Sequence, residues 1–142
     1  MAADKFDQTD LRQAFKQACD LMNAGRYDEL KPLFHEDMVY SRLHHPGWYQ
    51  RCSIVIDWLN AEKKNEQPQF IPDMEKAFPP SRSTGGTIQH VGGPAKWKHR
   101  REEVGEGEDI QYIFTFTRDK EGAPWLLIDA HGQVKPPGSA WG

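Results

Sequence analysis

The 142-residue sequence lacks long hydrophobic runs and carries almost no excess of charge. No apolar stretch approaches the roughly 18 residues that a transmembrane helix requires, and the mean hydropathy is −0.79. The 18 basic and 21 acidic side chains leave a net charge of −3, which does not create the positive field that nucleic acid binding needs. The opening residues MAADKFDQTD have no apolar core, so we expect no secretion signal and a cytoplasmic location. We therefore expect no nucleic acid and no membrane among the partners.

Cysteine is also scarce. Cys19 and Cys52 both fall on predicted helices, and we expect them to be free and buried. The sequence has no Cys-x-x-Cys motif, and its six histidines are scattered without ligand spacing, so we expect no metal site. It also contains no nucleophile elbow and no phosphate loop. We therefore expect neither a cofactor, nor double-displacement chemistry, nor nucleotide chemistry.

One basic run is followed at once by an acidic run. The basic residues are Lys96, Lys98, His99, Arg100 and Arg101, and the acidic ones are Glu102, Glu103, Glu106, Glu108 and Asp109. We interpret the two runs as the sides of a solvated hairpin that attract one another. A phosphate-binding role for the basic run is the alternative.

The N-terminal half has the periodicity of helices. Apolar residues from Leu11 to Met22 recur at helical spacing and form one stripe, and Gly25 provides a stop. The expected elements are, in order, a helix over 11–22, a short helix at 27–34, a strand at 38–43 and a helix over about 48–65.

From Gln69 onward the period changes to that of strands. We expect strands at Gln69–Ile71, Thr87–Val91, Ala95–Arg100, Ile110–Arg118 and Pro124–Val134. Helices followed by antiparallel strands predict an α+β fold, with a curved, mostly antiparallel sheet wrapped around three N-terminal helices. We expect a single domain over 1–142, with an ordered core of about 8–134 and a tail at 135–142. A cavity should remain where the sheet does not close around the helices.

Strand alternation identifies side chains that could face this cavity. It places His99 on the same face as Trp97, which we expect to be inward. In the last strand, Asp129 and His131 share a face with Leu127. A nearby Asp and His on a strand expected to be central and buried are unusual. A structural ion pair of Asp129 with Arg42 or with a histidine is the alternative interpretation.

Three stretches, taken in order, resemble a known family. They are AGRYDELKPLFHEDMVYSRL at residues 24–43, Gln89–Gly93 followed by Trp97, and the terminal strands Ile110–Arg118 and Trp125–Gly132. This order resembles the nuclear transport factor 2-like superfamily, in particular its SnoaL-like (polyketide-cyclase-like) branch. The resemblance implies a cone-shaped pocket between a curved sheet and three helices, often in a dimer. The superfamily includes isomerases, dehydratases, cyclases, epoxide hydrolases and proteins without catalytic activity.

The stretch around His90 looks like the matching strand of the scytalone dehydratases, in which a histidine at this place is catalytic. Other positions depart from the enzymes of the superfamily. Met22 and Asn23 stand where the dehydratases have a catalytic Tyr–Asp pair, and Arg42 stands in register with a tyrosine. Ser41 stands where the ketosteroid isomerase branch has an aspartate base.

These residues suggest cofactor-free acid–base chemistry, namely dehydration, isomerisation or cyclisation, on a small oxygenated organic substrate. We expect His90 to act as the base and Tyr40 to polarise the substrate oxygen. Asp129 and Arg42 are expected to orient the reacting groups or to neutralise their charge. An apolar wall for the substrate is expected from Trp58, Trp97, Tyr112 and Phe114, with His99 and His131 as further candidates.

Two other classes of function remain open. The chain could be a non-catalytic module that binds a ligand in the pocket or a partner on the sheet. It could also be the small subunit of a larger complex, in which case it would not form a stable homo-oligomer alone. For an enzyme or a ligand-binding module we expect a small-molecule ligand and a homodimer.

Overall fold

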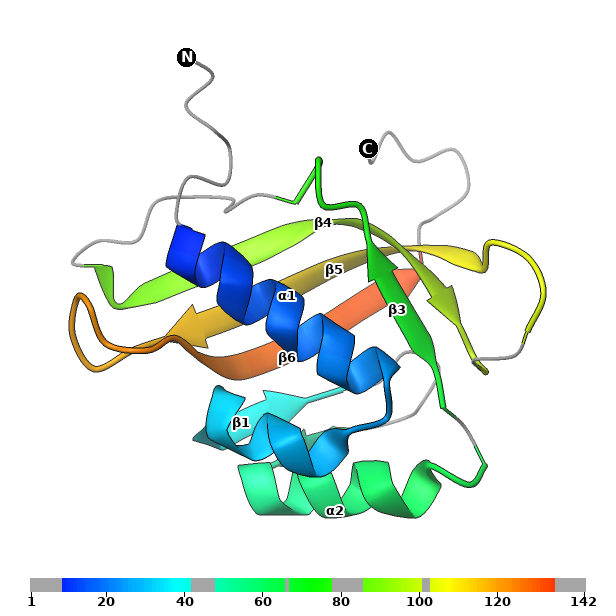
Figure 1. The fold of residues 1–142 in the computed structure, drawn as a ribbon, viewed down its shortest axis with the longest axis horizontal. Helices are drawn as coiled ribbons and strands as arrows, with labels where there is room; N and C mark the ends of the chain where they lie inside the picture. Colours follow the sequence, from blue (N-terminus) through cyan, green and yellow to red (C-terminus); the bar gives the residue numbers. More distant parts are fainter. Residues whose placement is uncertain (1–8, 42–47, 66, 78–85, 101–102, 135–142) are drawn as a thin grey trace.

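The sheet and the helix that crosses it dominate the structure (Figure 1). The computed structural model describes residues 9–41, 48–65, 67–77, 86–100 and 103–134. Its helical segments are α1 (Thr9–Asn23), the 3₁₀ helix η1 (Tyr27–Leu33) and α2 (Cys52–Glu62). Its strands are β1 (Phe34–Tyr40), β2 (Tyr49–Gln50), β3 (Gln69–Pro72), β4 (Ile88–Lys98), β5 (Glu108–Thr117) and β6 (Leu126–Val134). Among the described residues, no helix is long and apolar enough to cross a membrane.

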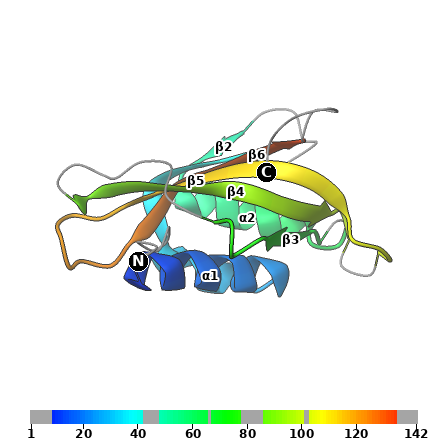
Figure 2. The same cartoon turned by 90° about the horizontal axis from the view of Figure 1, so that it is seen from above.

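The strands form one six-stranded sheet in the order β2-β1-β6-β5-β4-β3. The β1–β6 pair is parallel and the other neighbours are antiparallel. Seen from above, the sheet is curved and α1 lies along its inner side (Figure 2). This arrangement confirms the predicted α+β fold with a curved, mostly antiparallel sheet.

Helix α1 buries the apolar stripe that the sequence predicts. Phe15 is fully buried at its centre, where its ring stacks on Tyr112 at a centroid distance of 5.5 Å. The same ring makes edge contacts with Phe114 and Phe116 at 5.5 and 6.4 Å. The helix ends where Gly25 takes a left-handed φ of +71°, which L residues other than Gly adopt reluctantly.

Two of the predicted element boundaries are wrong. The helix expected from about Trp48 begins only at Cys52, because Tyr49 and Gln50 pair with β1 and Arg51 has a positive φ of 72°. The two strands expected over 87–100 are one strand, β4, which continues through the Gly-Gly-Pro segment at 92–94. Each residue of that segment keeps its partner in β5, so the two glycines do not end the strand.

A β-bulge in β6 changes the faces that simple alternation predicts. Thr115 pairs with Asp129 and Phe116 pairs with Leu127, so Ile128 is an extra residue between the two pairs. Leu127 and Ala130 therefore both point inward and are buried. The expectation that Asp129 shares the inner face of Leu127 is wrong, since the bulge turns Asp129 to the outer face beside Thr115.

The charged hairpin is present as predicted. Lys96 pairs with Asp109 across β4 and β5, and its Nζ lies 2.5 Å from Asp109 Oδ1 and 3.8 Å from Glu106 Oε2. These side chains are well exposed. The pairs therefore contribute little to stability and confirm the interpretation of a solvated hairpin.

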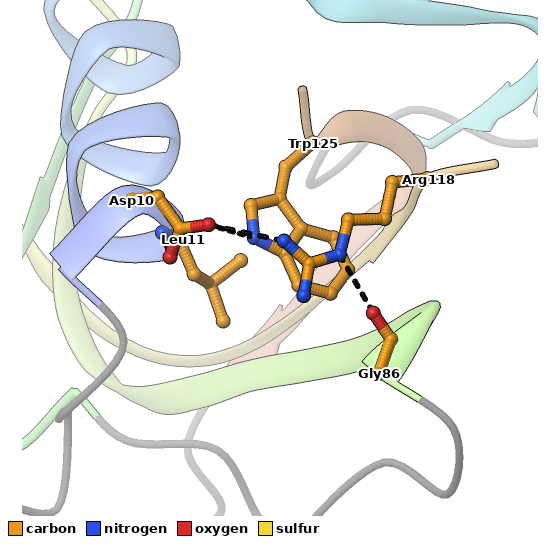
Figure 3. Close-up of polar contacts among 5 residues, drawn as sticks. All are labelled: Asp10, Leu11, Gly86, Arg118 and Trp125. Atoms are coloured by element: carbon orange, nitrogen blue, oxygen red, sulfur yellow. Dashed lines mark hydrogen bonds and ion pairs between the residues drawn. The ribbon is translucent and has the colours of Figure 1, made fainter. Parts of the chain in front are cut away.

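A polar cluster connects the start of α1 to two strand ends (Figure 3). Asp10 Oδ2 accepts hydrogen bonds from Arg118 Nη1 at 3.1 Å and from Trp125 Nε1 at 3.2 Å. Arg118 Nε donates to Gly86 O at 2.6 Å, and its guanidinium lies 4.0 Å from the centroid of the Trp125 ring. Only 9% of the Arg118 side chain is exposed, whereas 61% of the Asp10 side chain is, so the guanidinium is buried while the carboxylate stays hydrated.

We predict that Arg118→Met lowers the free energy of unfolding by about 1 kcal/mol, because it removes the hydrogen bond to Gly86 O and the contact of the guanidinium with the Trp125 ring while retaining much of the apolar stem. Urea denaturation followed by circular dichroism measures the change. Arg26→Met is the matched control, since Arg26 pairs with Glu29 at an exposed site. Equal denaturation midpoints for the two variants would show that the Arg118 cluster is not stabilising.

Candidate functional site

A small apolar cavity lies between the end of α1 and the inner face of the sheet. Its volume is about 40 Å³, which corresponds to about three water-sized groups. The lining, which we call the aromatic cavity, consists of Met22, Tyr40, Ser41, Phe70, Trp97, Ile110, Tyr112, Phe114, Ala130, His131 and Gly132. Strand alternation in β4 and β5 directs Trp97, Tyr112 and Phe114 to this face, as predicted from the sequence.

Phe70 of β3 forms one wall of the cavity. Its ring stacks on Phe114 at a centroid distance of 5.3 Å and an interplanar angle of 17°. It meets Tyr112 edge-on at 5.1 Å and 88°. Phe70 and Met22 are not among the residues predicted for the site, although the alternation of β3 and the stripe of α1 mark both as inward-facing.

Two polar atoms in this lining have no hydrogen-bond partner in the described part of the chain: Trp97 Nε1 and the Tyr112 hydroxyl. Trp97 is 7% exposed and Tyr112 is 1% exposed, so neither atom is compensated by bulk water. An unpaired buried donor costs about 1–3 kcal/mol, and such atoms are uncommon in folded proteins. Both atoms belong to side chains that line the same cavity, so this lining carries two donors without an acceptor among the described residues.

The phenol of Tyr112 remains a donor over a wide pH range. Burial raises the pKa of Tyr112 well above its usual value, and Cys19 and Asp73 add to the effect through their negative charge. Burial also raises the pKa of the neighbouring Cys19 thiol. The cavity therefore presents a neutral hydroxyl and not a phenolate.

The structure does not bring His90 to the aromatic cavity. His90 lies between the buried residues Gln89 and Val91, so its side chain points to the outer face of the sheet. There its Nδ1 lies 2.8 Å from the hydroxyl of Thr115, its cross-strand partner. The prediction that His90 acts as a base inside the pocket is therefore inconsistent with its position.

Asp129 and His131 form a pair on the outer face. His131 Nδ1 lies 3.1 Å from Asp129 Oδ1, with 49% of the His131 side chain and 41% of the Asp129 side chain exposed. When the proton is on Nδ1, it donates to Asp129 and leaves Nε2 able to accept a proton. His131 is also among the residues that line the aromatic cavity, although its side chain, like that of Asp129, lies on the outer face of the sheet.

The remaining predicted site residues are dispersed. Tyr40 lines the cavity, whereas Trp58 does not and instead stacks on Tyr49 at 4.4 Å. The prediction that His99 faces inward is wrong, because β4 ends at Lys98 and His99 is exposed beyond it. Arg42 lies outside the described residues. Within the described residues, no three His, Cys, Asp or Glu side chains are placed to hold a metal ion.

A larger open groove of about 670 Å³ lies between η1, β1 and the start of α2. Its charged residues have opposite signs, with Lys31 and Arg51 against Glu36 and Asp37. None of the unpaired buried side-chain atoms found in the described residues belongs to this groove. The aromatic cavity is therefore the better candidate site.

Comparison with solved structures identifies proteins of similar fold. An NTF2-like protein with a cystatin-like fold from Novosphingobium aromaticivorans superposes with a TM-score of 0.68 and 14% identity, covering 94% of this chain and 84% of that one. A candidate dehydratase of the NTF2-like family from Streptomyces avermitilis gives 0.68 and 15%, covering 92% and 96%. A candidate scytalone dehydratase from N. aromaticivorans gives 0.67 and 13%, covering 92% and 85%.

No protein-family model matches the sequence, and no curated protein matches it. At 13–15% identity the three structural matches establish the fold alone. They agree with the resemblance seen in the sequence and with the sheet order and helix placement described above. The chain has the nuclear transport factor 2-like fold.

Proposed function

We propose that the protein binds a small, uncharged organic molecule in the aromatic cavity. An oxygen acceptor on this molecule, such as a carbonyl, receives hydrogen bonds from the Tyr112 hydroxyl and from Trp97 Nε1. The observation that carries the proposal is the presence of these two buried, unpaired donors on one apolar cavity.

The lining favours a neutral ligand. Among the described residues it contains no Asp, Glu, Lys or Arg, and Tyr112 remains protonated because burial raises its pKa. A charged group would lose its hydration in this cavity without gaining an ionic partner. A carbonyl oxygen, in contrast, can accept two hydrogen bonds.

The volume favours insertion of a small head group. About 40 Å³ holds roughly three water-sized groups, which is too little for a fused ring system. The exposed residue His131 and the half-buried residue Ser41 mark where the lining reaches the surface. We therefore expect a methyl ketone or similar group to enter while the rest of the ligand remains near this rim.

Acid–base catalysis on the bound ligand is the second candidate. It is supported by the Asp129–His131 pair beside the cavity wall and by structural neighbours that are named as dehydratases. In this version Tyr112 polarises the substrate carbonyl inside the cavity, while His131, with its tautomer held by Asp129, acts as the base on the part of the substrate that remains outside the cavity.

We predict that Tyr112→Phe weakens acetophenone binding about tenfold, because one hydrogen bond to the carbonyl is lost. The free protein should be equally or more stable, since the variant removes a buried hydroxyl that has no partner. NMR titration gives the dissociation constants, and thermal unfolding gives the stability.

Two controls accompany this test. α-Methylstyrene has the shape of acetophenone without its oxygen, so Tyr112→Phe should not weaken its binding. Tyr49→Phe removes a hydroxyl outside the cavity lining and should not change acetophenone affinity. If Tyr112→Phe weakened the ketone and the hydrocarbon equally, hydrogen bonding by Tyr112 would be excluded as the cause.

We also predict that acetophenone affinity is constant from about pH 6 to about pH 9. The unperturbed pKa of a tyrosine is about 10, and the Tyr112 pKa is raised, so this hydroxyl does not ionise in that window. Catalysis through His131 would instead give a turnover of the ligand that is lost in His131→Gln. A flat affinity with no turnover would identify a binding protein, and a transition in the affinity itself would contradict our prediction.

A further inference from the structure

We infer that Asn23 is a positioning residue that fixes the Phe70 wall of the aromatic cavity and so limits the size of the head group that enters. The inference rests on the proposed function of this cavity. It assigns a role to the last residue of α1, which does not itself line the aromatic cavity.

The Asn23 side chain makes two hydrogen bonds to the backbone of one residue. Its Nδ2 donates to Phe70 O at 2.7 Å, and its Oδ1 accepts from Phe70 N–H at 2.7 Å. In addition, Gln69 Nε2 donates to the backbone oxygen of Asn23 at 2.7 Å. The end of α1 is thus bonded to β3 at two consecutive residues.

These bonds matter because β3 is the edge strand of the sheet. Phe70 is the cross-strand partner of Trp97 in β4, and β3 has no further strand of the described residues on its other side. The Asn23 amide occupies that side and supplies one donor and one acceptor, as a neighbouring strand would. No other standard side chain of this length presents both groups in one plane, since aspartate lacks the donor and leucine lacks both.

The end of α1 that carries Asn23 is itself held in place by hydrogen bonds. Gly25 N–H donates to Met22 O at 3.1 Å and Arg26 N–H to Leu21 O at 3.0 Å, which closes the helix end. Lys63 Nζ, just beyond α2, donates to Gly25 O at 2.8 Å. Asn23 therefore connects a fixed helix end to a four-residue strand that pairs with the sheet on one side only.

Phe70 transmits this constraint to the cavity. Its ring stacks on Phe114 and meets Tyr112 edge-on, and it lines the aromatic cavity directly. Without the Asn23 amide, the β3 backbone can move away from β4 and the Phe70 wall can move outward. The cavity would then accept larger head groups without any change in its hydrogen-bond donors.

The test compares ketones that differ only in the size of the inserted group. Acetophenone carries a methyl head and isobutyrophenone a branched isopropyl head. In the wild-type protein acetophenone should bind more tightly, and Asn23→Ala should reduce this preference at least about threefold, given the value of each buried methylene. Asn60→Ala is the matched control, because Asn60 donates to Asp28 at an exposed site and its loss should leave the preference unchanged.

Asn23→Asp provides a second variant with a distinct signature. At neutral pH the carboxylate faces the Phe70 carbonyl oxygen without a donor, so the size preference should fall as in Asn23→Ala. When the pH is lowered to about 4.5, a protonated carboxyl can donate to Phe70 O and accept from Phe70 N–H, which should restore the preference. Wild type should show no such recovery.

The outcomes separate this inference from the proposed function. If wild type binds the ketones and both Asn23 variants keep its size preference, the inference is overturned. If wild type binds neither ketone, the proposed function fails, and the hydrogen exchange of the Phe70 amide then decides the inference. Exchange that accelerates at least about tenfold in Asn23→Ala and not in Asn60→Ala would support the role of Asn23, and unchanged exchange would overturn it.

Discussion

The packing of Phe15 against the inner face of the sheet is the contact on which the rest of the structure depends. This one ring touches Tyr112, Phe114 and Phe116, which β5 directs inward at every second residue. A sheet that curves around a helix must fill the space beneath its centre, and close packing of aromatic rings fills it here. Burying these rings sets the distance between α1 and the sheet and leaves only the end near Met22 partly open.

The functional proposal follows from this filling. The aromatic cluster leaves a cavity of only about 40 Å³. Trp97 and Tyr112, which line it, nevertheless carry buried polar atoms without partners among the described residues. A protein that needed only a stable core would have an advantage with phenylalanine at position 112, since an unpaired buried hydroxyl is destabilising. In the proposed function, this hydroxyl recognises an acceptor on the ligand.

Much of the fold could be predicted from the sequence, because helical and strand periodicities are directly visible in α1 and β5. The order of three stretches also identified the fold correctly. The site was harder to predict, because a single bulge at Ile128 reverses the face of Asp129, and no residue type marks that bulge. For His90, the resemblance to a catalytic strand suggested a role in the pocket, whereas the alternation between Gln89 and Val91 directs its side chain outward. The hydrogen bonds of Asn23 join residues 47 positions apart, and no local pattern encodes them.

The central claim is that the two buried donors of the aromatic cavity bind an external acceptor. The indole N–H of Trp97 reports this directly in a ¹H–¹⁵N NMR spectrum, with Trp97→Phe used to assign its signal. We expect this signal to move downfield on addition of acetophenone, and to remain in place on addition of α-methylstyrene, which fills the same space without an acceptor. A Trp97 signal that moved equally with both compounds, or with neither, would contradict the account.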